Sequence, residues 1–80
     1  MAARTLTLPS GAKVRTASQR RYVLVRDVVS RTGDKPPKGD VVKRSDTLAT
    51  VQRHRKGSYF DATTAITEHV FDTVTGEQVR

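Results

Sequence analysis

The sequence predicts an α+β fold: a three- to four-stranded antiparallel sheet with one helix packed on one face, in the order β-β-α-β-β. Three observations lead to this prediction. Residues 20–31 have strand composition, residues 41–57 carry helix start and stop signals, and residues 65–71 are rich in β-branched types. We expect one small α+β domain over residues 20–80, preceded by a basic N-terminal arm at residues 1–19.

The arm contains little that demands burial. Threonine and leucine alternate over residues 5–8 like a strand fragment, but Pro9, Ser10 and Gly11 end the pattern at once. Residues 13–18 are largely polar and include the cations Lys13 and Arg15. We therefore expect this segment to be flexible in part.

Residues 20–31, RRYVLVRDVVSR, are the strongest strand candidate, because their tyrosine, leucine and valines fit a pleated surface. Successive side chains of a strand point to opposite faces. One face therefore carries Tyr22, Leu24 and Val28, and the other carries Val23, Val25 and Val29. With apolar residues on both faces, we expect a central strand, covered by the helix on one side and by the arm or a partner on the other.

Residues 32–40, TGDKPPKGD, predict a loop, since two prolines, two glycines and alternating charges leave nothing to anchor them. Val41 and Val42 resume strand character directly afterwards. The simplest interpretation is a hairpin with a long tip.

The segment after this hairpin has helix signals at both ends. Ser45 or Asp46 can cap the first turn, and Leu48 and Val51 are spaced to lie on one face. Gly57 offers a left-handed stop. The last turn gathers cations that the helix dipole stabilises, namely Arg53, His54, Arg55 and Lys56.

The C-terminal segment allows both a helix and a strand over residues 62–69. Its many β-branched residues favour a strand over residues 65–71. The following DTVTGE predicts a turn, in which Asp72 bonds forward to the backbone and Gly76 adopts a positive φ. Residues 78–79 can then fold back as a short final strand.

The segments VVKRSDTLATVQRHRKG and VFDTVTGEQVR resemble small uncharacterised β-β-α-β-β proteins of actinobacteria and especially of their phages. The matching residues are Ser45 to Leu48 and Asp72 to Glu77, which are a helix cap and a turn, and the resemblance covers roughly residues 20–80. It implies a phage or actinobacterial origin and a non-enzymatic accessory role. It carries over no functional residues.

Charge is unevenly distributed along the 80 residues, whose formal net charge is +7. Residues 1–31 hold seven Lys and Arg against one carboxylate, residues 32–57 hold seven against three, and residues 58–80 hold one against four. This distribution favours an anionic partner, and charge compensation between segments is the alternative interpretation.

Cysteine is absent, which excludes disulfides and thiolate metal sites. No apolar run approaches the roughly 18 residues of a membrane helix. We therefore expect a cytoplasmic protein that makes no membrane contact.

Catalysis and metal binding have little support. His54 and His69 fall on different elements, and Glu68, the neighbour of His69, points to the opposite face of a strand. Carboxylates such as Asp61 and Asp72 lack the short spacings of metal ligands, and neither glycine-containing loop has the spacing of a phosphate loop. We predict no enzymatic activity, no catalytic residues, no metal and no cofactor.

Nucleic-acid binding, to DNA or RNA through phosphate contacts with little sequence specificity, is the function that the residues favour most. The candidate binding residues are Arg15, Arg20, Arg21, Lys35, Lys38, Arg53, Arg55 and Lys56. A merely solvated surface is an equal alternative for these cations. Tyr59 or Phe60 can stack on a base, but their position just after a helix favours packing in the core or at its rim.

The alternative function is that of a phage-type accessory protein that binds and modulates a host protein. An exposed strand edge, or the two-faced strand at residues 20–31, would pair with another chain. A homodimer is the simplest form of such pairing.

Overall fold

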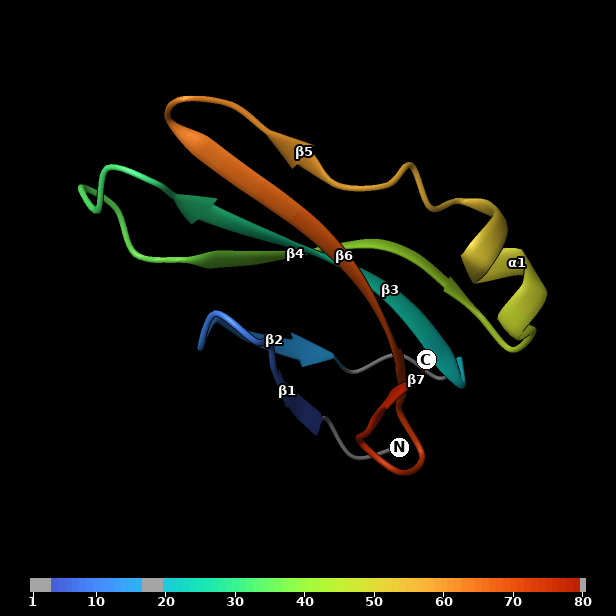
Figure 1. The fold of residues 1–80 in the computed structure, drawn as a ribbon. Coiled ribbons are helices and arrows are strands. Elements are labelled where there is room, and N and C mark those ends of the chain that lie inside the picture. The colour runs from blue at the N-terminus through green and yellow to red at the C-terminus, as the bar shows by residue number, and fades with distance from the viewer. Residues whose placement is uncertain (1–3, 17–19, 80) are drawn as a thin grey trace.

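The central antiparallel sheet is covered by a short helix on one face and by a two-stranded hairpin on the other (Figure 1). The computed structural model describes residues 4–16 and 20–79. Its elements are β1 (Arg4–Thr7), β2 (Lys13–Thr16), β3 (Tyr22–Ser30), β4 (Lys38–Ser45), α1 (Leu48–Arg53), β5 (Tyr59–Phe60), β6 (Thr64–Asp72) and β7 (Gln78–Val79).

The main sheet has five strands in the order β4-β3-β6-β5, and β7 also pairs with β6. Strand β3 lies at the centre. It pairs with β6 over its whole length, from Tyr22 opposite Asp72 to Ser30 opposite Thr64. Its pairing with β4 shifts register between Leu24 and Val25.

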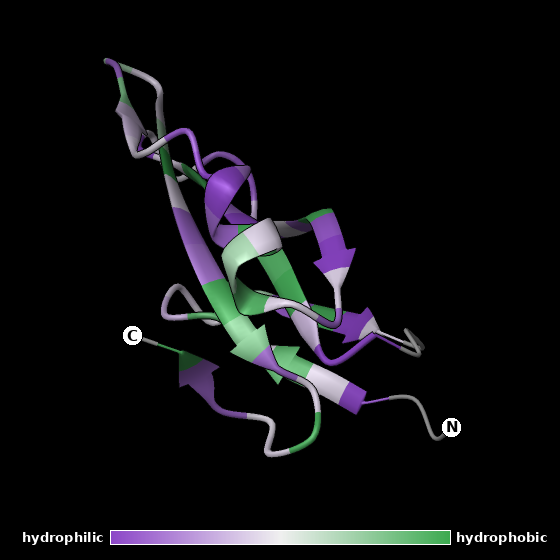
Figure 2. Ribbon diagram, turned by 90° about the vertical axis from the view of Figure 1, so that its right-hand side faces the viewer, coloured by the Kyte–Doolittle hydropathy of each residue, from purple (hydrophilic) through white to green (hydrophobic). Residues whose placement is uncertain are grey.

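Helix α1 packs on the face of the sheet that carries Leu24 and Val70. These two residues and Val51 of α1 form a core cluster in which each side chain is at most 1% exposed. Burying a side chain of this size contributes about 1.5 to 3 kcal/mol. The helix is hydrophobic at its start and hydrophilic at its end (Figure 2), because Leu48 and Val51 are followed by Gln52 and Arg53.

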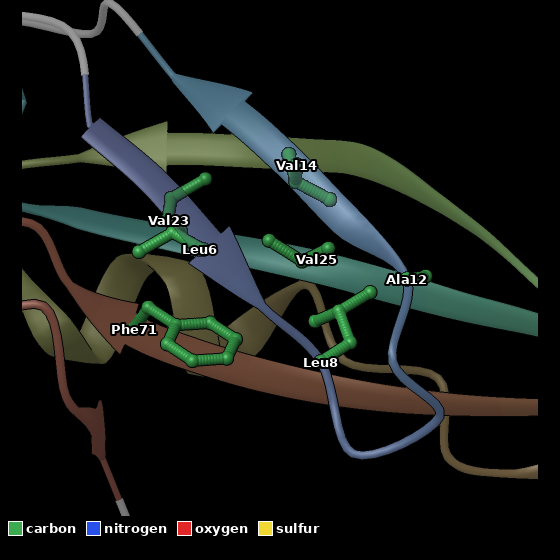
Figure 3. Packing of buried hydrophobic residues seen from close by; sticks show 7 residues of the cluster. All are labelled: Leu6, Leu8, Ala12, Val14, Val23, Val25 and Phe71. Atoms are coloured by element: carbon green, nitrogen blue, oxygen red, sulfur yellow. The ribbon is translucent and has the colours of Figure 1, made fainter.

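The β1–β2 hairpin packs on the opposite face, and its side chains form the larger core cluster (Figure 3). The members are Leu6, Leu8, Ala12 and Val14 from the hairpin with Val23, Val25 and Phe71 from the sheet. At the end of this face, the hydroxyl of Ser10 donates a 2.6 Å hydrogen bond to the buried carboxylate of Asp27. The hairpin is therefore one layer of the fold.

The structure differs here from the arm that we predicted for residues 1–19. Residues 4–16 form the β1–β2 hairpin, and residues 1–3 and 17–19 lie outside the described residues. Leu6 faces Val14 across the hairpin, so the turn at Pro9–Gly11 joins two short strands rather than ending one. The two-faced composition of β3 supplied the surface that this hairpin covers.

Helix α1 is also shorter than the sequence predicted. Asp46 accepts hydrogen bonds from Arg20 and from the amide of Arg21, so it does not cap the helix, and the N-cap is Thr47, which makes no side-chain capping bond. The helix ends at Arg53, before Gly57. The amides of Lys56 and Gly57 donate to Glu68 instead of to helix carbonyls, which draws the chain away from the helix axis.

The remaining predicted elements are confirmed, with one strand added. Strand β6 contains the strand predicted at residues 65–71, Asp72 accepts a bond from the amide of Val74, and Gly76 has a φ of 78°. Strand β4 begins at Lys38, inside the predicted loop. The sheet has five strands rather than three or four, because β5 also pairs with β6.

Candidate functional site

Helix α1 covers only part of its side of the sheet. A helix of six residues is about 9 Å long, whereas a strand of nine residues extends about 30 Å. The helix lies at one end of β3, and the β3–β4 loop and the β5–β6 turn lie at the other end (Figure 1). The sheet beyond α1 therefore keeps an uncovered surface on the helix side.

The strand registers define this surface, which we call the open face. Leu24 lies under α1, and side chains two and four positions further along β3 share its face. Arg26 is opposite Asp40 and Glu68, and Val28 is opposite Lys38 and Ile66. With the β5 residue that faces Ile66, the open face comprises Arg26, Val28, Ser30, Lys38, Asp40, Tyr59, Thr64 and Ile66.

Two hollows lie along the open face. The near hollow, of about 340 Å³, is next to the segment that follows α1 and is lined by Arg26, Lys56, Gly57, Ser58, Tyr59 and Ile66. The far hollow, of about 390 Å³, is at the β3–β4 loop and is lined by Val28, Ser30, Thr32, Asp34, Lys35, Pro36, Lys38, Thr63 and Thr64.

Glu68 holds in place two residues that line the near hollow, Lys56 and Gly57. Its side chain is buried, and its Oε1 accepts hydrogen bonds from the backbone amides of Lys56 at 2.7 Å and Gly57 at 2.5 Å. Its Oε2 is buried without a hydrogen-bond partner. The side chain of Glu68 thus holds the segment carrying Lys56 against the sheet.

The carboxylates around the far hollow are also bound within the fold. Hydroxyl bonds from Ser30 and Thr32 lower the pKa of Asp34. The amide of Thr63, the hydroxyl of Tyr59 and the amide of Thr64 hold the pKa of Asp61 at about 2. These aspartates are therefore ionised at neutral pH and serve as local hydrogen-bond acceptors.

Two of the predicted binding residues are held in ion pairs at the start of β3. Arg20 lies 3.0 Å from Asp46, and Arg21 lies 3.1 Å from Asp72. Burial raises the pKa of Asp72, but the Arg21 hydrogen bond and the amide of Val74 outweigh it, so the pKa is lowered. The same hydrogen bond raises the pKa of Arg21.

The eight predicted binding residues do not all gather in one place. Lys35 and Lys38 line the far hollow, and Lys56 lines the near one. Arg53 ends α1, and Arg55 follows it in the segment that leads to the near hollow. Arg15 points away from the sheet on the outer side of the hairpin, because Val14 and Thr16 point inward.

Sequence reasoning missed Arg26 and the exposure of the β5 aromatics. Arg26 follows Tyr22 and Leu24 in the alternation of β3, so the sequence predicts that it lies on the helix side of the sheet. The sequence does not predict that α1 ends early enough to leave Arg26 uncovered. Tyr59 and Phe60 are 55% and 67% exposed, so neither packs in the core. Their strand β5 is an edge of only two residues.

The described residues contain no cluster of side chains suited to binding a metal ion. Residues 4–16 and 20–79 contain no group of three or more His, Asp or Glu positioned to hold a metal ion. The ring of His69 bonds to Thr67, and Glu68 lies on the other face. No helix in the described part of the chain has the length and apolar character to cross a membrane.

Comparison with known proteins places the chain in no family: no family model, curated protein or solved structure matches it.

Proposed function

We propose that this protein binds nucleic acid without catalysis, through phosphate contacts made by the open face and the basic segment after α1. The supporting observation is an asymmetry between its acids and its bases. Most carboxylates, at the surface as well as in the interior, accept bonds from the protein's own backbone amides, hydroxyls or one of three cations. Among the described Lys and Arg residues, only Arg20, Arg21 and Lys38 form ion pairs.

The consequence is a set of cations that keep their charge available to a partner. On and beside the open face these are Arg26, Lys35, Arg53, Arg55 and Lys56. Unpaired cations along one surface attract the phosphate backbone and release its condensed counterions, which favours binding irrespective of sequence. The internal bonds of the carboxylates lower the cost of bringing a polyanion close to them.

Fluorescence anisotropy with labelled single-stranded DNA, duplex DNA and RNA tests this proposal. We expect affinity to fall with salt, with a log–log slope of about 0.9 for each phosphate neutralised on a duplex and about 0.7 on a single strand. Absence of binding to all three at about 50 mM salt would falsify the proposal.

A pair of charge-matched variants locates the site. The double substitution Arg26→Gln, Lys56→Gln removes two cations from the near hollow, and Lys13→Gln, Arg15→Gln removes two from the outer side of the hairpin. The first should lower the salt slope by about 1 for each cation that contacts a phosphate, and the second should leave it unchanged. Equal losses in both variants would point to net charge rather than to the open face.

A further inference from the structure

Tyr59 lines the near hollow, and a hydrogen bond within the protein engages its hydroxyl. It is 55% exposed, lines the hollow, and donates a 2.8 Å hydrogen bond from its hydroxyl to Asp61. The neighbouring Phe60 points to the other face of the sheet, where it lies opposite Ala65 and the guanidinium of Arg31 covers its ring at 3.9 Å. Tyr59 is thus the exposed aromatic of the open face, and its hydroxyl is bonded within the protein.

Two cations share the hollow with this ring. Arg26 comes from the central strand, and Lys56 comes from the segment that Glu68 holds against the sheet. Neither forms an ion pair with a described carboxylate. The volume of about 340 Å³ falls within the range of about 300 to 1,000 Å³ that is usual for small-ligand sites.

We propose that the near hollow binds one unpaired base of a single-stranded nucleic acid, stacked on Tyr59, with the flanking phosphates contacting Arg26 and Lys56. This inference rests on the proposed function and adds the strandedness of the ligand. An aromatic ring that shares a hollow with cations binds any base through its π-face, which explains affinity without sequence preference. In a duplex the base faces are already stacked on one another, so the ring can engage a base only when it is unpaired.

The inference is tested by removing the bases while keeping the phosphates. Wild-type protein is titrated with a labelled thymidine oligonucleotide and with an abasic strand of equal length, which carries the same charge. We expect the abasic strand to bind about 5- to 150-fold more weakly, the effect of losing one stacked base. The same labelled thymidine strand, annealed to its complement, should likewise bind more weakly than when single.

Variants then assign the effect to one ring. Tyr59→Leu should lose the preference for the thymidine strand over the abasic strand. Tyr59→Phe, which keeps the ring and loses only the bond to Asp61, should retain it, as should Phe60→Leu on the opposite face. Circular dichroism verifies that each variant is folded, and the wild-type comparison stands without any variant.

Equal affinities of wild-type protein for the thymidine and abasic strands would overturn the inference while leaving phosphate-led binding intact. A preference that survives in Tyr59→Leu would also overturn it. Failure of both strands to bind at low salt would instead reject the proposed function itself.

Discussion

Oε1 of Glu68 lies 2.7 Å from the backbone nitrogen of Lys56, and this bond joins the segment after α1 to the sheet. It has two effects. It ends the helix early, because an amide that donates to Glu68 is not available to a helix carbonyl. Glu68 also bonds to the amide of Gly57, and Lys56 and Gly57 both line the near hollow, so the same carboxylate limits α1 and positions part of the candidate site.

Replacing this carboxylate should therefore weaken both stability and binding. We expect Glu68→Ala to lower the free energy of unfolding by about 1 to 3 kcal/mol, because the backbone amides of Lys56 and Gly57 both lose their acceptor. Urea titration followed by circular dichroism measures the loss. Glu68→Gln keeps an acceptor oxygen, so its free energy of unfolding should lie between those of wild type and Glu68→Ala. A Glu68→Ala variant as stable as wild type would show that the bonds from Glu68 to the two amides do not stabilise the fold.

Gly39 should not tolerate a side chain. It lies on the hairpin side of β4, where an added Cβ would come within 2.7 Å of Cδ1 of Leu8 and would also overlap Val14, and both side chains are buried. Gly39→Ala should cost about 1 to 3 kcal/mol through overpacking. Lys38→Ala, at the exposed neighbouring position, should change stability by less than about 0.5 kcal/mol. Thermal or urea unfolding compares the stabilities of Gly39→Ala and Lys38→Ala. Equal stabilities would mean that the hairpin does not pack tightly against β4.

Periodicity and turn chemistry predicted the sheet because they act locally. The alternation of residues in β3 predicted which side chains lie on each face of the strand. Asp72 and Gly76 alone predicted the turn that follows Asp72. The role of the hairpin was not readable in this way. Leu6 and Leu8 alternate with threonines over too few residues to show by themselves that they fill the second face of β3.

The candidate site was less predictable because it depends on contacts between distant residues. Charge alone indicated Arg21 and Lys56 equally, yet Arg21 is engaged by Asp72, 51 residues away, while Lys56 borders a hollow. Arg26 became a candidate only once the length of α1 and the register of β6 were known. Long-range pairing of this kind has no signature in the local sequence.

Asp61 should make the protein less stable in acid. Its pKa is lowered from the ordinary 3.8 to about 2, first by the amide of Thr63 and then by Tyr59 and the amide of Thr64. A carboxyl group whose pKa is lower in the folded state stabilises the fold at any pH above its unfolded-state pKa. This contribution is lost as the pH falls from about 4 through about 2. In Asp61→Asn, which does not titrate, urea midpoints should fall less over this range. Parallel curves for both proteins would contradict the assignment.

Substitution of Arg21 should affect stability, whereas substitution of Arg26 should affect binding, although Arg21 directly precedes β3 and Arg26 lies within it. Arg21 donates through Nε and Nη2 to Asp72, which is only 8% exposed, so Arg21→Ala leaves a buried carboxylate with fewer donors. We expect it to lower the urea midpoint and to leave nucleic-acid affinity unchanged in the folded protein. Arg26 forms no ion pair among the described residues and lines the near hollow, so Arg26→Ala should weaken binding with little effect on the midpoint. Anisotropy and urea titration on both variants check the contrast, and a reversal of the two phenotypes would move the binding surface to the start of β3.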